Sequence, residues 1–335
     1  MSVTTPKTQV PAALDDNRAR NRAIVTSPIV IAAAAAILIL IVGQILSPGF
    51  ASYGQIVSML RVASFLGIMA IGQTIVILSG NTGIDLSVGT VATFGAIVGA
   101  RIMGGDNSNL FLGIVIPLLI GALLGAINGV GIVVLKIPPF VMTLGMMGVA
   151  TGLALAYTAG VAGGRSAPGL TWLVNERVLF GIPGVVFIWI ALIAIITFLL
   201  RRTVPGWNLF AVGTNRRAAR LSGLPVNRTV IAAYSASGFF AVLGGLMMLG
   251  YSESVFLDIA NDQMLPTVAA VIIGGTLAMG GVGGYVGSAI GACVLTFLDS
   301  FLGAQNMPEA WRMVINGLVL LFILALYGRQ RRLRA

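Results

Sequence analysis

Long apolar runs, separated by short polar segments, dominate the sequence. Runs such as 29–46, 110–135 and 185–200 are long enough, or nearly long enough, to cross the roughly 30 Å apolar layer of a lipid bilayer. A backbone inside that layer must satisfy its own hydrogen bonds, and runs of this length indicate helices, whereas a barrel would show alternating segments of about ten residues. The pattern therefore predicts an all-α, polytopic integral membrane protein.

About ten transmembrane helices are predicted from the apolar runs. They cover residues 29–47, 60–79, 86–103, 111–135, 139–160, 184–200, 229–250, 266–279, 285–302 and 310–328. The eighth is short for a full crossing, which leaves open that 266–284 forms a broken or re-entrant element. The expected organisation is a tail at 1–27, a membrane domain at 28–328 with a polar loop at 201–228, and a basic tail at 329–335.

The distribution of basic residues predicts the orientation. Only 9% of residues are charged, and the net charge is +10. With the N-terminus inside the cell, only five of the 20 lysines and arginines fall outside, namely Arg61, Arg101, Arg165, Arg177 and Arg312. Cytoplasmic loops of membrane proteins carry such an excess of Lys and Arg, so both termini are predicted to be cytoplasmic. Because these charges lie at the ends of spans, they indicate membrane orientation and not nucleic-acid binding.

The residue content argues against catalysis by this chain. It has no histidine and a single cysteine, Cys293, so an ordinary zinc, haem or iron–sulfur site is not expected. Without histidine there is no Ser–His or Cys–His pair. The phosphate-binding pattern GxxxxGK[ST] is also absent. We therefore expect no catalytic residue, metal or bound cofactor, and no ATP hydrolysis by the chain itself.

The polar loop 201–228 reads RRTVPGWNLFAVGTNRRAARLSGLPVNR. Pro205-Gly206 is expected to turn the chain, and Asn215 to cap a short cationic helix, RRAARLSG, that stops at Gly223 and Pro225. One interpretation is a helix that docks into the groove of a partner. The other is a solvated loop held by anionic lipid headgroups.

Small residues and tryptophans give expectations about packing. Glycines recur every four residues within the predicted helices, at 95/99, 121/125/129, 148/152 and 287/291. This spacing lets helix backbones approach closely, within one subunit or between two. Trp172, Trp189 and Trp311 are expected at the level of the lipid headgroups.

Five motifs in sequence order carry a family resemblance. The segment GTNRRAARLSGLPV (213–226) resembles the coupling-loop motif of permease subunits of bacterial ABC importers for simple sugars, the ribose, xylose, arabinose and galactoside group. The others are AIGQTIVILSGNTGIDLSVG (70–89), GAINGVGIVVLKIPPFVMTLGMM (125–147), FLLRRTVPGWNLFAVG (198–213) and VIIGGTLAMGGVGGYVGSAIGA (271–292). Together they cover most of the chain from about residue 60 onward.

The resemblance implies a heteromeric importer in the bacterial inner membrane that moves a monosaccharide such as ribose. It implies a second permease copy or a sister permease, an ABC ATPase subunit that binds ATP and magnesium, and a periplasmic sugar-binding protein. Many such permeases place an acidic residue before the paired alanines, where this chain has Arg216-Arg217. The implied contact with the ATPase falls on Gly213, Asn215, Arg216, Arg217, Ala218, Ala219, Arg220, Leu221, Ser222 and Gly223.

Polar residues within the apolar runs are candidates for the translocation pathway or its gate. Asp85 follows a glycine-rich turn at or near the cytoplasmic side, with Ser87 beside it. Asp85 is expected to cap the next helix, and an intramembrane carboxylate also suits a gate. Asn128 forms interhelical hydrogen bonds or faces the channel, and Asp299 lies near the outer end of its helix.

Two other functions stay open at this point. One is a permease of the same broad superfamily for branched-chain amino acids or nucleosides. The other is a secondary transporter driven by protons or sodium, which would need intramembrane carboxylates for coupling. Asp85 and Asp299 are the only candidates for that role.

Overall fold

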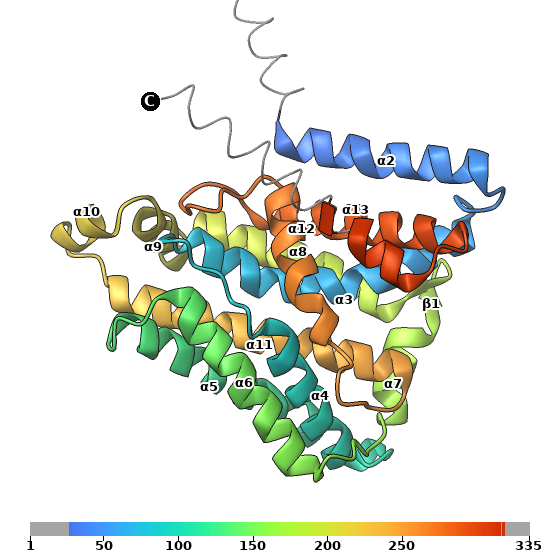
Figure 1. Cartoon of the computed structure of the whole chain (residues 1–335), viewed down its shortest axis with the longest axis horizontal. Coiled ribbons are helices and arrows are strands. Elements are labelled where there is room, and N and C mark those ends of the chain that lie inside the picture. The colour runs from blue at the N-terminus through green and yellow to red at the C-terminus, as the bar shows by residue number, and fades with distance from the viewer. Residues whose placement is uncertain (1–26, 316, 319–335) are drawn as a thin grey trace, which may run out of the picture.

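The computed structural model describes residues 27–315, 317 and 318, and the chain within them is almost entirely helical (Figure 1). The elements are α2 (Pro28–Leu46), α3 (Tyr53–Leu78), α4 (Val88–Met103), η1 (Asn107–Asn109), α5 (Leu110–Val133), α6 (Pro139–Thr158), α7 (Pro168–Asn175), β1 (Arg177–Leu179), β2 (Ile182–Pro183), α8 (Gly184–Arg202), α9 (Val204–Thr214), α10 (Arg216–Leu221), α11 (Val226–Ser252), η2 (Asn261–Gln263), α12 (Met264–Ile273) and α13 (Tyr285–Ala304). The predicted tails, except Ser27, and most of the predicted helix 310–328 lie outside the described residues.

Seven helices of the described part are long and apolar enough to cross a membrane. They are α2, α3, α5 with η1, α6, α8, α11 and α13. Helix α4 has 16 residues and α12 only 10. The prediction of a polytopic helical membrane protein is therefore confirmed, and the predicted helix 266–279 ends early, at Ile273.

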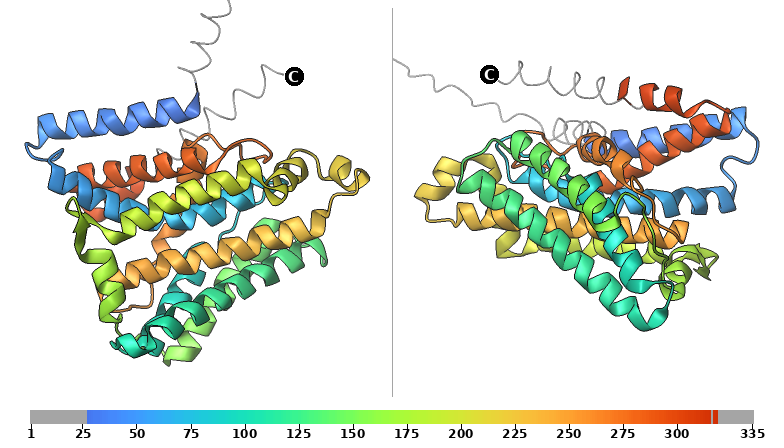
Figure 2. Two further views of the ribbon diagram at one scale, coloured as in Figure 1. Left: turned by 180° about the vertical axis from the view of Figure 1, so that it is seen from behind. Right: turned by 60° about the horizontal axis from the view of Figure 1, so that its bottom comes forward.

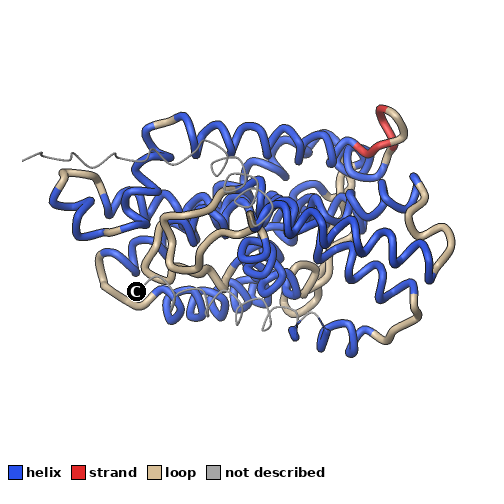
Figure 3. The backbone as a smooth tube through the Cα atoms, turned by 90° about the horizontal axis from the view of Figure 1, so that it is seen from above, coloured by secondary structure: helices blue, strands red, loops and turns tan. Residues whose placement is uncertain are grey.

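Helix α3 lies at the centre of the bundle and contacts α11, α13, α12 and α8. Helix α11 packs along α5 and α4 on the other side, while α2 lies at the outer edge against α13 (Figure 2). The short helix α10 projects at one end of the long axis, and α7 with the β1–β2 hairpin lies at the opposite end (Figures 1 and 3). We call these the α10 end and the α7 end.

Two short helices, α4 and α12, begin beside each other in the fold. Loop 79–87 leads into α4, and loop 253–260 leads through η2 into α12. The beginnings of these two helices meet: the Thr93 hydroxyl donates to Asn261 Oδ1 at 3.0 Å and accepts from the Ala260 amide at 3.1 Å. These two bonds join the first half of α4 to the segment that leads into α12.

Close helix packing through glycine is confirmed for α5 and α11. A Cβ added at Gly125 would lie 2.1 Å from the Tyr234 carbonyl oxygen, and one at Gly121 would lie 2.5 Å from that of Gly238. At Gly148 and Gly152, by contrast, an added Cβ would meet no atom within 4 Å. The glycine spacing thus serves packing within the subunit on α5, and leaves the glycine face of α6 uncovered.

The expectation for Trp189 is wrong. Its side chain is only 3% exposed, and Nε1 donates to the Tyr285 hydroxyl at 2.8 Å. That hydroxyl donates in turn to the Gly67 carbonyl at 2.8 Å, which joins α8, α13 and α3. Trp172 and Trp311 are exposed, in accord with an interfacial position.

Candidate functional site

The polar loop folds as two helices, α9 and α10. Pro205-Gly206 does not turn the chain as expected, because both residues lie in the first turn of α9, where proline needs no N–H partner. The predicted cap is confirmed: Asn215 Oδ1 accepts from the amides of Arg217 and Ala218, each at 3.0 Å. The short helix α10 then ends before Gly223, which has a φ of +78°.

Helix α10 has an inward and an outward face. Ala219 is buried and Arg216 is half-buried, three residues apart and therefore on one side of the helix. The outward face carries the exposed residues Arg217, Ala218, Arg220, Leu221 and Ser222, followed by exposed Gly223. Leu221 is 84% exposed, which is unusual for so apolar a side chain beside three arginines. The residues implied to contact the ATPase thus divide between the two faces.

The base of α10 rests on glycines from three distant segments. Gly213, at the end of α9, is buried, and a Cβ there would lie 1.9 Å from the Leu78 carbonyl oxygen. The Gly281 amide donates to the same oxygen at 3.1 Å. A Cβ at Gly280 would lie 2.3 Å from the Cα of Gly80. The end of α3, the end of α9 and loop 274–284 therefore touch backbone to backbone beneath α10.

Arg216 adds a polar contact at the same place. Its Nη2 donates to the carbonyls of Ser79 and Gly80, each at 3.2 Å. These oxygens lie at the C-terminal end of α3, where the helix dipole favours a cation. Burial, reinforced by the nearby charge of Arg220, lowers the pKa of the Arg216 guanidinium, which still remains protonated because arginine starts above 12.

Loop 79–87 carries Asp85 into the interior, where its carboxylate is 1% exposed. Oδ1 accepts from the Ser87 amide at 3.0 Å and from the Ser87 hydroxyl at 2.6 Å. Oδ2 accepts from the Ser237 hydroxyl of α11 at 2.7 Å. The Asn128 side chain of α5 donates through Nδ2 to the Ser87 hydroxyl at 3.1 Å. Three helices thus meet around one buried carboxylate.

Gln73 of α3 completes this group. With its amide in the orientation that satisfies both groups, the side chain donates to the Asp85 carbonyl at 3.1 Å and accepts from the Asp85 amide at 3.3 Å. All five side chains are buried. We call Gln73, Asp85, Ser87, Asn128 and Ser237 the Asp85 cluster. It connects α3, α4, α5 and α11 through hydrogen bonds.

The geometry corrects the expectation that Asp85 caps α4. The carboxylate accepts no hydrogen bond from the first turn of α4, and its one amide donor, Ser87, is itself the N-cap residue of that helix. Its partner Ser237 lies about 16 Å from Val226 along α11, a helix about 40 Å long, so the carboxylate is enclosed by the bundle. The carboxylate therefore acts mainly as a cross-link between helices.

Asp299 lies apart from the Asp85 cluster. It forms an ion pair with Arg312 at 3.1 Å, and its side chain is 47% exposed. Phe301, on the same stretch of α13, packs against Phe50, which lies just before α3. Asp299 is therefore near the α7 end, away from α10.

Sequence reasoning missed Gln73 and Ser237. Each is an uncharged polar residue in a long, mostly apolar helix, as Asn128 is, but each helix has further polar residues beside it. Neither residue is charged, and although Gln73 lies within the 70–89 motif, nothing in that motif singles it out. Only the contact with Asp85, 12 and 152 residues away in the chain, shows their role.

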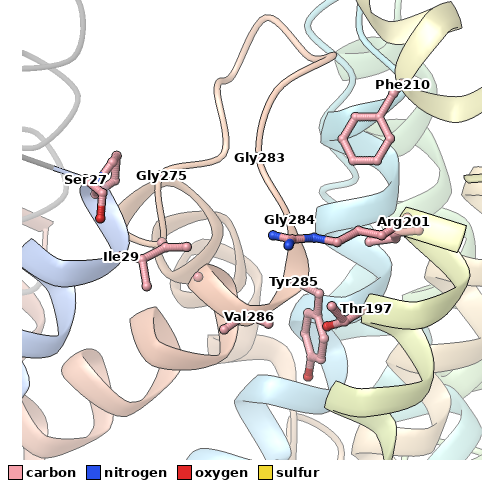
Figure 4. Close-up of a pocket in the computed structure, with 14 residues that line it drawn as sticks. Ser27, Ile29, Thr197, Arg201, Phe210, Gly275, Gly283, Gly284, Tyr285 and Val286 are labelled. Atoms are coloured by element: carbon pink, nitrogen blue, oxygen red, sulfur yellow. The ribbon is translucent and has the colours of Figure 1, made fainter. Parts of the chain in front are cut away.

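Two cavities lie elsewhere on the protein. One of about 140 Å³ opens at the α10 end between the start of α2, the end of α8 and the start of α13, with Arg201 directed toward Gly284 (Figure 4). A more polar cavity of about 570 Å³ at the α7 end is lined by Arg165, Trp172 and Glu253, among others. Neither is lined by a residue of the Asp85 cluster.

Comparison with known proteins identifies similar chains over most of the sequence. A family model described as "Branched-chain amino acid transport system / permease component" matches residues 55–324. The ribose import permease protein RbsC of Haemophilus influenzae is 36% identical over 289 residues, which cover 85% of this chain and 88% of the relative. RbsC of Escherichia coli K12 is 33% identical, with 85% and 88% covered. The autoinducer 2 import system permease protein LsrC of Enterobacter sp. 638 is 34% identical, with 86% and 82% covered.

Proposed function

The chain belongs to the family described as the permease component of the branched-chain amino acid transport system, and from this we propose that it is the membrane permease subunit of an ABC importer for a monosaccharide. The relatives named for ribose import match most of both chains, which favours a ribose-like sugar over amino acids or nucleosides. Their description as import permeases also argues against an ion-driven secondary transporter. The protein resides in the bacterial inner membrane as a multi-pass permease.

The importer contains further subunits in this proposal. An ATPase subunit binds ATP and magnesium, since GxxxxGK[ST] is missing from this chain. A periplasmic binding protein delivers the sugar, and a second permease copy or a sister permease completes the channel, with membrane lipid around it. The excess of basic residues in predicted inside loops supports cytoplasmic termini and about ten crossings of the domain 28–328, with loop 201–228 in the cytoplasm.

The outward face of α10 is the proposed docking surface for the ATPase. The observation that carries this is an exposed Leu221 among exposed arginines on a capped helix that projects from the bundle. Because Leu221 is 84% exposed, its burial by a partner contributes about 1.5–3 kcal/mol to the free energy of binding. Gly213, Asn215 and Gly223 shape the helix ends, while Arg216 and Ala219 face the permease.

The translocation pathway is proposed to open beside the Asp85 cluster. Asp85, Ser87 and Asn128 hold α4, α5 and α11 together, so these helices separate only if the hydrogen bonds among the three residues and Ser237 rearrange. This supports a gate at that depth. Asp299, a half-exposed carboxylate near the α7 end, is proposed at the external mouth of the path.

Transport by the reconstituted complex tests the proposal. Permease, ATPase and binding protein are placed in proteoliposomes, and uptake of labelled ribose and other pentoses and hexoses is measured with ATP supplied at the ATPase face. We expect uptake of at least one sugar that depends on ATP and on the binding protein. Uptake driven by a proton or sodium gradient without ATP would contradict the proposal.

A charge placed on the docking surface tests the role of α10. Leu221→Asp is expected to reduce ATPase co-purification and ATP-driven uptake at least tenfold, because a buried unpaired carboxylate replaces an apolar contact. Val204→Asp is the matched control, since Val204 is 72% exposed at the start of α9. Equal effects of the two variants would show that α10 is not the docking element.

A further inference from the structure

We propose that Arg216 is a positioning residue that joins α10 to the buried Asp85 cluster through loop 79–87, so that movement of α10 displaces the cluster. This rests on the proposed role of α10 as the docking element of the ATPase, and adds the route by which docking acts on the membrane interior. The route has three parts: Arg216 itself, the conformation of loop 79–87, and Tyr234 beside the loop.

Arg216 is the part of α10 that enters the permease. Its guanidinium binds two consecutive carbonyls, of Ser79 and Gly80, and its Nε is buried without a partner. The planar guanidinium leaves little freedom in such a two-point contact. Arg217, the next residue, is exposed, so the two adjacent arginines of α10 have different surroundings. A displacement of α10 therefore pulls or pushes on the end of α3.

Loop 79–87 is held in a conformation that it would not keep alone. Gly80, Asn81 and Thr82 have successive φ values of +78°, +59° and +52°, and the last two are uncommon for residues with a side chain. The turn closes with the Gly83 amide donating to the Gly80 carbonyl at 3.2 Å. Backbone strain of this kind persists only where surrounding contacts impose it. The contact from Arg216 falls on the first residue of this strained run.

Tyr234 lies between the two ends of the route. It is on α11, one turn before Ser237, and its buried hydroxyl has no hydrogen-bond partner. That hydroxyl would lie 3.4 Å from a Cβ at Gly83, and it is within electrostatic range of both the Asp85 carboxylate and the Arg216 guanidinium. An unpartnered buried hydroxyl favours any movement of the loop that brings it an acceptor. A shift of the loop that offers this hydroxyl an acceptor would therefore be stabilised.

Arg216, the strained loop 79–87 and Tyr234 together connect the docking helix α10 to the Asp85 cluster over a short path. Asp85 follows Ser79 by six residues, and both its backbone and its carboxylate are hydrogen-bonded to other helices. A shift of the loop at Gly80 must therefore be absorbed either in the strained turn or at the bonds of Asp85. Because Gly80 packs against Gly213 and Gly280, little of the shift can be absorbed there, and we expect it to reach the bonds of Asp85.

The test compares Arg216→Ala with the matched control Arg217→Ala in the complete reconstituted importer. Both variants remove one arginine from α10, the first half-buried and the second exposed. For each we measure ATPase co-purification, and the number of sugar molecules imported per ATP hydrolysed. We expect Arg216→Ala to keep ATPase binding within twofold while the ratio falls at least fivefold. Arg217→Ala is expected to keep the native ratio, even if docking weakens and both rates fall together.

A label on the loop gives a readout that a purely structural role would not change. Thr82→Cys, in a Cys293→Ser background, places a single thiol at an exposed position of the loop. With Arg216 present, the rate at which maleimide labels this thiol is expected to change at least threefold when vanadate traps the ATPase with nucleotide. With Arg216→Ala, the labelling rate is expected to stay the same in both states.

The outcomes separate this inference from the proposed function. If the native complex shows no ATP-driven sugar uptake, the proposed function fails. If it imports sugar and Arg216→Ala retains both the native ratio and the labelling response, only the role of Arg216 is refuted. Should Arg216→Ala not fold, Arg216→Lys replaces it: loss of the two-point contact is expected to lower the ratio two- to threefold, and a native ratio overturns the inference.

Discussion

Replacement of Asp85 tests whether the buried cluster is held by hydrogen-bond geometry or by charge. The carboxylate accepts three hydrogen bonds, two from Ser87 and one from Ser237, and no lysine or arginine of the described residues lies within 4 Å. Two substitutions of Asp85 distinguish the contribution of hydrogen-bond geometry from that of charge. Asp85→Ala removes every acceptor, whereas Asp85→Asn keeps the shape and one acceptor but loses the charge.

The expected magnitudes follow from the partners of each oxygen. In Asp85→Ala, the Ser87 amide and hydroxyl lose their acceptor, and each loss lowers the free energy of unfolding by about 1–3 kcal/mol. The Ser237 hydroxyl can instead donate to the carbonyl four residues back in its own helix. The desolvation penalty of the buried carboxyl group also disappears, which returns part of this cost. A net loss of about 3 kcal/mol is expected. In Asp85→Asn, Oδ1 keeps the Ser87 bonds and Nδ2 donates to Ser237, so the loss is about 1 kcal/mol.

The assay is the apparent melting temperature of the purified permease in nanodiscs. At about 1–2 °C per kcal/mol for a chain of 335 residues, Asp85→Ala should melt about 3–6 °C lower and Asp85→Asn about 1–2 °C lower. Asp106→Ala is the control, because Asp106 is exposed and accepts one amide bond, from Ser108 at 2.9 Å. If Asp85→Asn melted as low as Asp85→Ala, the charge and not the hydrogen-bond geometry would hold the cluster. Native melting of Asp85→Ala would refute the role of the cluster altogether.

Three further predictions concern packing and capping. Gly125→Val should prevent accumulation of folded permease in detergent, because its Cβ would lie 2.1 Å from the Tyr234 carbonyl oxygen. The control Gly148→Val should accumulate normally, and size-exclusion profiles of the two variants test this difference. Asn215→Ala should cost about 1 kcal/mol of local stability and speed hydrogen exchange across α10 about fivefold. An unchanged exchange rate would show that the cap does not stabilise α10. Trp189→Phe should lower stability by about 1–3 kcal/mol, because it leaves a buried tyrosine hydroxyl short of a donor; an unaltered melting curve would contradict this.

Local features of this protein follow directly from the order of its residues. Apolar runs of about 20 residues determine membrane helices, because a backbone in lipid must bond to itself. The limits of α5, α6, α8 and α13 lie within two residues of the prediction on that basis. Asn215 determines the start of α10 and Gly223 follows its end, since capping and left-handed backbone act between near neighbours.

Only the tertiary structure decides which side chains meet. In a soluble protein the alternation of apolar and polar residues marks the buried face of a helix, but helices that are apolar all round give no such mark. Hence the contact of Asp85 with Ser237, the buried position of Trp189 and the inward direction of Arg216 are absent from the local pattern. Each depends on contacts more than 90 residues apart in sequence, and on how closely glycine allows the helix backbones to approach.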